Sequence, residues 1–318
     1  MRFVVYGAGA VGGVMGGRLH LAGHEVVLIA RGAHHDAIKE RGLLVETPES
    51  GDRVRVPVVR HPSELEFRPD DAIVLGMKTQ DTAAALEALS AVAPPSVSIV
   101  CAQNGVENER LALRRFAKVY AMCVVIPAAH LEPGVVQAFS APTHGVLDLG
   151  RYPEGTDATA EALAEALGKS GFESTARPDI MRFKYGKLLT NLVNAAEVVC
   201  GRGAEAAEVV AAARDEGRAV LEAAGIPFSE TGMEAYPAVT IRPTVSAGRW
   251  PGSSSLQSVR RGTGTIEADY LNGEIALLGR TLGVPTPVNA ALQRLAGLVT
   301  REGRELGSFS PADVLAAG

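Results

Sequence analysis

The chain has 318 residues, a formal net charge of −5, 47% hydrophobic residues and 21% charged residues. This balance is typical of a globular protein and argues against a disordered chain, and the length suffices for two domains. Because no block of lysine or arginine occurs, the sequence gives no basis for binding nucleic acid or a membrane surface, and we expect a small-molecule ligand.

The beginning of the chain predicts a strand, a tight turn and a helix. An apolar run over 3–6 leads into a glycine-rich loop that fits the pattern G-x-G-x-x-G. The residues of this loop are Gly7, Ala8, Gly9, Ala10, Val11 and Gly12. In such loops the first glycine makes the turn, the second admits a pyrophosphate, and the third lets the helix pack closely on the strand. The sequence therefore predicts a dinucleotide site, with a glycine turn that binds nothing as the alternative.

The next elements complete the unit that this motif requires. Helix-like residues continue to Ala22, Gly23 ends the helix, and a second strand is predicted over 25–30. An acidic residue at the end of that strand would favour NAD, but this chain has Arg31, whose guanidinium can pair with a 2′-phosphate. We therefore expect NADP(H) as the cofactor, with an exposed loop arginine as the alternative interpretation of Arg31.

The pattern then continues as a doubly wound sheet. A peripheral strand pair is expected at 43–45 and 54–56, followed by a buried strand, a helix and another strand at 71–76, 81–92 and 98–102. Strands at 119–126, 135–139 and 145–149, a helix at 156–169 and a last strand at 172–175 complete this domain.

Two polar residues follow the buried strands of this domain. Lys78 comes after the strand at 71–76, and Asn104 comes after the strand at 98–102. Ligands of open α/β sheets bind beyond the carboxyl ends of the strands, so both residues are candidates for ligand contact. The alternatives are a solvated lysine before a capped helix and ordinary Asn-Gly turn chemistry.

From Pro178 onward, long alanine-rich helical patterns replace the strands. We expect helices over about 178–199, 205–224, 253–282 and 289–302. The chain thus predicts an α/β fold in which an N-terminal Rossmann-type doubly wound sheet, residues 1–176, precedes an all-helical domain, residues 177–318.

The first of these helices carries a polar stripe. At about 100° per residue, Lys187, Asn191 and Asn194 fall on one narrow face of an otherwise apolar helix. Buried amides and ammonium groups need partners. Either a neighbouring helix supplies these partners or the stripe lines a ligand cleft, and we favour the cleft.

The three cysteines, Cys101, Cys123 and Cys200, have no C-x-x-C spacing and lie among apolar residues. They are typical of reduced core residues, so we expect neither a metal site nor disulfides, and a cytoplasmic location. The N-terminus enters a strand without a signal-peptide pattern, and the apolar stretches are shorter than the ~20 residues of a membrane helix.

Taken together, these motifs resemble the ketopantoate reductase (2-dehydropantoate 2-reductase) family over almost the whole chain. The matches are the glycine-rich loop with Arg31, Lys78, Gln103-Asn104-Gly105, Lys187-Leu188-Leu189 with Asn191, Ser254-Ser255 with Gln257, and the run from Glu267 to Gly273. The resemblance implies NADPH-dependent reduction of a 2-oxo acid to a 2-hydroxy acid, most simply ketopantoate to pantoate in pantothenate biosynthesis.

The resemblance also implies roles for individual residues. Lys187 would be the general acid. Asn104, Asn191 and Ser254 would hold the substrate, and Lys78, Asn104 and Glu267 would contact the cofactor. Our reading of the helical stripe adds Asn194 to the substrate residues.

Three departures from the family pattern leave the 2-oxo acid open. Ala195 stands where a second asparagine is usual, one position after Asn194, and Tyr185 replaces a tryptophan. The segment 261–266 is one residue longer than the common pattern. Two further functions stay open, an opine-type dehydrogenase that reduces an imine and an NADP(H)-binding sensor without turnover. The oligomeric state is also open, with a homodimer as one candidate.

Overall fold

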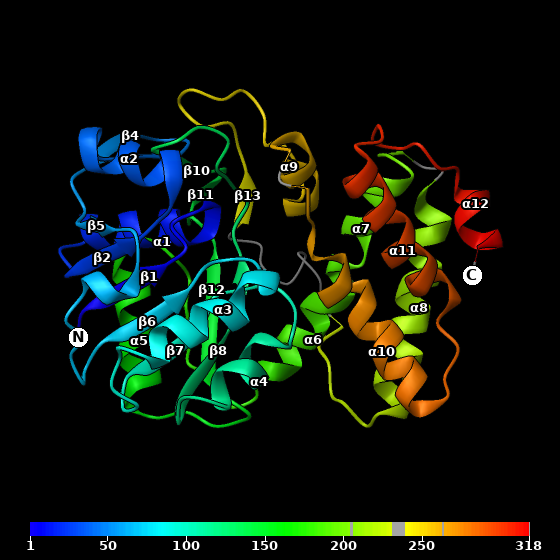
Figure 1. Cartoon of the computed structure of the whole chain (residues 1–318), viewed down its shortest axis with the longest axis horizontal. Helices are drawn as coiled ribbons and strands as arrows, with labels where there is room; N and C mark the ends of the chain where they lie inside the picture. Colours follow the sequence, from blue (N-terminus) through cyan, green and yellow to red (C-terminus); the bar gives the residue numbers. More distant parts are fainter. Residues whose placement is uncertain (204–205, 231–238, 263, 318) are drawn as a thin grey trace. The chain divides into compact units, whose positions relative to one another are not determined.

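The structure is a computed structural model that describes residues 1–203, 206–230, 239–262 and 264–317 (Figure 1). The chain forms two compact units. The first comprises residues 1–181 and the described part of 233–250, and the second comprises the described parts of 182–232 and 251–318. The first unit therefore extends past the sequence boundary at 176/177 and also takes up a later segment.

The first unit is built on a mainly parallel sheet. In the order in which they lie, its described strands are β12 (Val146–Arg151), β8 (Lys118–Val125), β7 (Ser98–Cys101), β6 (Ala72–Leu75), β1 (Phe3–Tyr6), β2 (Val26–Ile29) and β5 (Val58–Val59). Among these strands, only β12 runs antiparallel to its neighbour. Strands β2, β1, β6 and β7 are buried along their whole length, which fits their continuous apolar sequences.

Helices cover both faces of this sheet. They are α1 (Ala10–Leu21), α2 (Gly32–Arg41), α3 (Thr79–Ser90), α4 (Asn108–Leu113) and α5 (Ala158–Lys169), with a short 3-10 turn η1 (Pro62–Glu64). Val5 packs in one core cluster with residues of α1 and α5, whereas the neighbouring Val4 packs in a second cluster with residues of α3 and α4. This alternation confirms the predicted doubly wound sheet, with one core on each face.

A smaller sheet lies beside α1 and contains a peripheral strand pair. The first strand of this pair agrees with the prediction at 43–45, whereas the second lies at 51–54 and the prediction of 54–56 was displaced. The strands of the sheet are β4 (Gly51–Val54), β3 (Leu43–Glu46), β10 (Val135–Ala138) and β9 (Ala128–Ala129). β3 and β4 pair antiparallel. The predicted strand at 172–175 is reduced to isolated bridges of Glu173 and Ala176 to β12.

One strand of the first unit comes from a part of the chain where no strand was expected. β13 (Val239–Ile241) pairs antiparallel with β11 (Ser140–Pro142). After β13, the chain stays attached to the first unit through main-chain hydrogen bonds. The N–H of Arg242 donates to the Phe139 oxygen, and the N–H of Val245 donates to the Thr47 oxygen. The side chain of Ser246 also donates to the buried carboxylate of Glu46. The prediction of only helices beyond residue 178 was therefore wrong, because a three-residue strand depends on a partner about a hundred residues away.

The second unit is helical in its described residues, as predicted. Its elements are α6 (Ile180–Asn191), α7 (Val193–Val199), α8 (Ala207–Ala223), α9 (Ser254–Arg260), η4 (Glu267–Tyr270), α10 (Asn272–Leu282), α11 (Pro287–Glu302) and α12 (Pro311–Ala316), of which α6 begins at the boundary of the first unit. In Figure 1, α10 and α11 lie in front of α8. The predicted start of α8 at Glu205 lies outside the described residues.

Two helices predicted as continuous are interrupted. The expected helix over 253–282 consists of α9, η4 and α10, because Gly262 and Gly264 adopt φ values of +63° and +69° that end a right-handed helix. The expected first helix divides into α6 and α7 at Leu192, whose main-chain oxygen accepts a hydrogen bond from the Asn272 amide over 3.3 Å.

Candidate active site

The glycine-rich loop has the local geometry that a dinucleotide requires. At Gly7, with φ of +97°, an added Cβ would lie 2.6 Å from the Met77 nitrogen, and at Gly12 it would lie 2.2 Å from the Gly7 oxygen. At Gly9, which precedes the first residue of α1, it would meet no protein atom within 4 Å. Gly7 and Gly12 therefore allow close packing inside the protein, whereas Gly9 faces open space, as a site for a pyrophosphate needs.

The other loop residues continue this arrangement. Ala8 is buried, and Ala10 and Val11 begin α1 with half-buried side chains. No acidic residue lies in the first turn of α1, so the unpaired N–H groups there are available to an anion. The donor set and the space at Gly9 fit a pyrophosphate.

A histidine that sequence analysis did not identify fixes the main chain of this loop. Nε2 of His34, in α2, lies 2.7 Å from the Ala8 oxygen, and its Nδ1 accepts the N–H of Gly134 over 2.9 Å. Both bonds hold at once only if Nε2 carries the proton, so the ring is neutral. Burial and the ring of His130, 4.0 Å away between centroids, lower the pKa of His34 to about 4. The sequence offers no signal for this role, since the partners lie 26 and 100 residues away.

Arg31 lies in the turn that the sequence predicts, two residues after the last residue of β2 and immediately before the first residue of α2. Its side chain is exposed, and Nη2 donates to the hydroxyl of Tyr6 over 3.4 Å. Tyr6 ends β1 and is buried, so it gives the guanidinium a fixed neighbour near the glycine-rich loop. An exposed guanidinium next to such a loop can bind a phosphate through several donors.

Lys78 and Asn104 follow two adjacent parallel strands, β6 and β7, and both are half-buried. A buried polar network holds the two loops together. The Gln103 amide donates to the Met77 oxygen over 2.9 Å and to the Thr82 hydroxyl over 2.8 Å, and Thr82 in turn donates to the side chain of Asn108.

Asn108 completes this network, because its own amide reaches the main-chain oxygen of Asn104 over 3.1 Å. Lys78 and Asn104 are thus placed by groups that the sequence did not mark for that purpose. Together with the glycine-rich loop and Arg31, they form one set at the carboxyl ends of β2, β1, β6 and β7.

A second set lies on α6 and α7 of the second unit. Lys187 is half-buried in α6, Asn191 is the buried last residue of α6, and Asn194 lies in α7. Asn194 is 7% exposed, yet its amide makes no hydrogen bond to any described residue. Ala195 is buried in the core instead. The amide oxygen and nitrogen of Asn194 are not among the fully buried unbonded atoms, so water or a ligand can reach and bond them.

The remaining predicted residues belong to α9 and η4. The hydroxyl of Ser253 caps α9 by accepting from Leu256 N, whereas that of Ser254 bonds no described residue. α9 packs against α7, which carries Asn194. Glu267 begins η4 and is buried. Sequence analysis did not identify Lys184, one turn before Lys187 and only 3% exposed.

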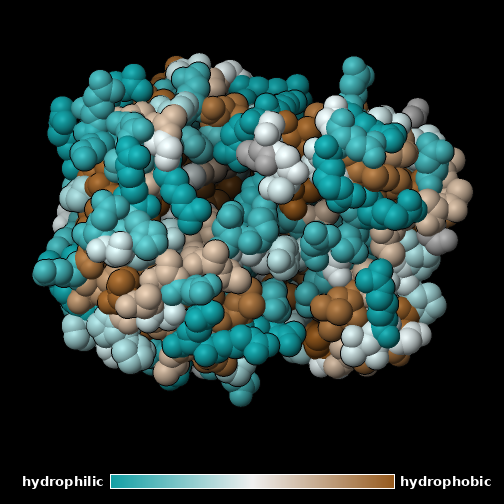
Figure 2. All heavy atoms as spheres, viewed as in Figure 1, coloured by the Kyte–Doolittle hydropathy of each residue, from teal (hydrophilic) through white to brown (hydrophobic). Residues whose placement is uncertain are grey.

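The described residues contain no cluster of histidine, cysteine, aspartate or glutamate that could hold a metal ion. A helix with the length and apolarity of a membrane span is likewise absent from that part of the chain. Figure 2 shows polar residues over much of the visible surface, with apolar residues in separate groups between them.

Comparison with known proteins identifies the family. The sequence model "Ketopantoate reductase PanE/ApbA" matches residues 3–154, and "Ketopantoate reductase PanE/ApbA C terminal" matches residues 179–300. The chain is 28% identical to 2-dehydropantoate 2-reductase of Pyrococcus horikoshii over 93% of this chain and 96% of the relative. It is 29% identical to 2-dehydropantoate 2-reductase of Halobacterium salinarum over 95% and 100%.

Solved structures agree. A PanE/ApbA family ketopantoate reductase from Ralstonia eutropha JMP134 has a TM-score of 0.79 and 28% identity, covering 96% of this chain and 100% of that chain. A D-mandelate dehydrogenase solved with NADH and anilino(oxo)acetate also has a TM-score of 0.79, with 25% identity and coverage of 96% and 99%. Both halves of the chain match the family, and the chain therefore belongs to the ketopantoate reductase PanE/ApbA family of oxidoreductases.

Proposed function

We propose that the protein reduces a 2-oxo acid to a 2-hydroxy acid with NADPH, most simply 2-dehydropantoate to pantoate, with Lys187 as the general acid. The observation that carries this proposal is Asn194, a residue that is only 7% exposed, whose amide bonds no described residue and keeps access to solvent or a ligand. A carboxylate or carbonyl substrate would give this amide a hydrogen-bond partner.

The glycine-rich loop and Arg31 would hold the cofactor, which supplies a hydride when bound. The space at Gly9 admits the pyrophosphate, and the exposed guanidinium of Arg31 would pair with the 2′-phosphate. Lys78, Asn104 and Glu267 would make further cofactor contacts. The D-mandelate dehydrogenase was solved with NADH, so the preference for NADPH in this chain rests on Arg31.

Lys187 would act on the carbonyl oxygen of the substrate. As a hydride reaches the ketone carbon, negative charge develops on that oxygen, and the ammonium group stabilises it and then gives it a proton. The lysine, left neutral, takes a proton from solvent before the next turnover. Asn104, Asn191, Asn194 and Ser254 would bond the carboxylate and the remaining polar groups of the substrate.

A second substrate class has two observations in its favour. The chain is as similar in fold to the D-mandelate dehydrogenase as to the ketopantoate reductase. By the resemblance to the family, a second asparagine is also usual at Ala195, whereas this chain has its asparagine one position earlier, at Asn194. An aromatic 2-oxo acid is therefore the second candidate.

The test is NADPH oxidation, followed by absorbance, with a panel of 2-oxo acids that includes 2-dehydropantoate and an aromatic 2-oxo acid, each with and without amines. We expect turnover that no amine accelerates. A rate that requires an amine would favour an opine-type dehydrogenase, and binding of NADPH without turnover of any 2-oxo acid would favour a sensor. A cytoplasmic location, a role in pantothenate biosynthesis and assembly as a homodimer remain predictions.

A further inference from the structure

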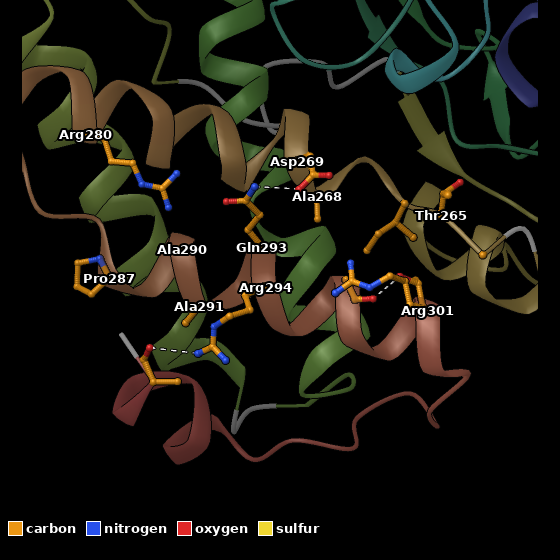
Figure 3. Close-up of a pocket in the computed structure, with 15 residues that line it drawn as sticks. Thr265, Ala268, Asp269, Arg280, Pro287, Ala290, Ala291, Gln293, Arg294 and Arg301 are labelled. Carbon is orange, nitrogen blue, oxygen red and sulfur yellow. Dashed lines mark hydrogen bonds between the residues drawn. The ribbon is translucent and has the colours of Figure 1, made fainter.

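None of the residues assigned to the proposed active site lines a pocket in the second unit, although Ile266 and Ala268, the chain neighbours of Glu267, do line it. It has a volume of about 490 Å³ and is formed by the segment 264–269, α10, α11 and the end of α12 (Figure 3). Ligand pockets typically measure about 300–1,000 Å³. The pocket is thus large enough for a small organic molecule.

Positive charge dominates the lining. Arg280 from α10 and Arg294 and Arg301 from α11 line the pocket. Asp269, the one carboxylate among the described lining residues, accepts a hydrogen bond from the Gln293 amide over 2.8 Å. In Figure 3, Arg280 and Arg294 lie on one side of Gln293 and Arg301 lies on the other.

Within the part of the chain that the structure describes, these arginines have no ion-pair partner. Arg294 donates to the Ala317 oxygen over 3.3 Å, and within the described residues Arg280 and Arg301 form no side-chain hydrogen bond or ion pair. Other surface arginines of the same unit are paired, for example Arg218 with Asp215 over 3.1 Å. The pocket therefore presents guanidinium groups whose donors remain available to a ligand.

The spacing of the charges limits the kind of ligand. Arg294 and Arg301 lie seven residues apart on α11, or about 10 Å along a helix. Ala290, Ala291 and Ile266 add apolar surface between the arginines. A ligand that meets all three arginines carries more than one anionic group on an organic body, since a single small ion spans only one end.

We propose that this pocket binds a multiply charged organic anion, with phosphate or carboxylate groups held by Arg280, Arg294 and Arg301. Planar guanidinium groups bind both kinds of oxyanion through paired hydrogen bonds. The concave shape favours a small molecule over an acidic protein surface. The proposal does not depend on the reductase activity, because no lining residue belongs to the proposed active site.

The experiment titrates inorganic pyrophosphate and citrate, in separate runs, into the purified full chain by isothermal calorimetry. Pyrophosphate is the phosphate probe and citrate is the carboxylate probe. The test variant combines Arg280→Gln with Arg301→Gln, and the matched control is Arg218→Gln on α8. All three side chains are exposed, so we expect unchanged melting temperatures without an anion.

We expect at least one probe to bind the wild type and the control equally, and the double variant at least about tenfold more weakly, since charge-assisted hydrogen bonds are lost. Rising salt should weaken this binding. The glycine-rich loop is the same in all three proteins, so it cannot produce the difference. The chemistry of the probe that binds more tightly indicates the natural anionic group.

Three results would overturn the proposal. The first is absence of saturable binding of both probes at millimolar concentration. The second is equal weakening in the double variant and the control, which would show binding to positive charge in general. The third is a wild type that is a dimer and a double variant that is a monomer, as measured by size-exclusion chromatography with light-scattering detection. This result would show that a second copy of the chain occupies the pocket. If the wild type turned over no 2-oxo acid with NADPH, that result would contradict the proposed function but not the anion site, which the calorimetry tests separately.

Discussion

The amide of Gln103 donates to the main-chain oxygen of Met77 over 2.9 Å, which fastens the loop after β7 to the loop after β6. Thr82 shares the same amide and passes the connection to Asn108. The positions of Lys78 and Asn104 therefore depend on buried hydroxyl and amide groups. These groups lie behind the two loops and would not themselves contact a ligand.

Thr82 gives a clean test of this network. Thr82→Val keeps the volume but loses two buried hydrogen bonds, so we expect the free energy of unfolding to fall by about 1–3 kcal/mol and NADPH to bind more weakly. Urea unfolding and cofactor titration measure the two effects. Thr82→Ser keeps the hydroxyl and is the control. Equal affinity for NADPH in Thr82→Val and Thr82→Ser would show that this hydrogen-bond network does not influence cofactor binding.

Arg31 should determine the choice of cofactor. We expect Arg31→Ala to weaken NADPH by about one to two decades and NADH far less, because a guanidinium–phosphate contact contributes roughly 1.5–3 kcal/mol. Fluorescence titration of both cofactors into wild type and variant checks this. If the affinity for NADPH does not change, Arg31 lies outside the site and the preference for NADPH loses its basis.

Lys187 should matter for the chemical step and not for folding. General acid catalysis contributes about 10²–10⁴-fold, so we expect Lys187→Met to lower kcat by at least about that factor while NADPH still binds. Steady-state rates and a melting curve of the same preparation are the measurements. Normal turnover, or an unfolded variant, would make this lysine a structural residue.

Asn194 tests whether the shifted asparagine is part of the substrate site. Since its amide bonds no described residue, Asn194→Ala should cost little stability but raise KM for the true 2-oxo acid about tenfold, the effect of one hydrogen bond to a charged group. The variant keeps Asn191, the other proposed substrate asparagine, so the change in KM reports on Asn194 alone. A lower melting temperature with an unchanged KM would instead indicate a neighbouring helix as its partner.

His34 predicts how stability depends on pH. The pKa of this histidine is lowered to about 4 in the folded chain from an ordinary value near 6.5, so the unfolded chain binds the proton more readily between these values. The free energy of unfolding should therefore fall as the pH falls from 6.5 to 4, by at most about 1.4 kcal/mol per pH unit from this group. His34→Gln, which keeps a donor and an acceptor but does not titrate, should flatten that part of the profile. An unchanged slope in chemical unfolding across these pH values would show that another group is responsible.

Sequence patterns predicted local features well. The β1–α1–β2 unit, the turn at Gly7 and the close approach of Gly12 to Gly7 depend on residues close together in the chain, so motif and periodicity were sufficient. The partners of Gln103 and His34 lie at least 21 residues away, and no local pattern marks them. The same limit explains β13, whose residues are ordinary until β11 pairs with them. Similarly, the main-chain oxygen of Leu192, between α6 and α7, bonds to Asn272, eighty residues further on.

The segment that contains β13 makes the two units topologically nested. The chain completes most of the first unit, enters the second, returns to add β13 with Ser246, and then finishes the second. A protein cut once after residue 181 would leave β11 without its strand partner and the buried carboxylate of Glu46 without the Ser246 hydroxyl. Neither half of the gene therefore encodes a complete folding module, so exchange of substrate domains between relatives would need two crossover points, one on each side of this segment.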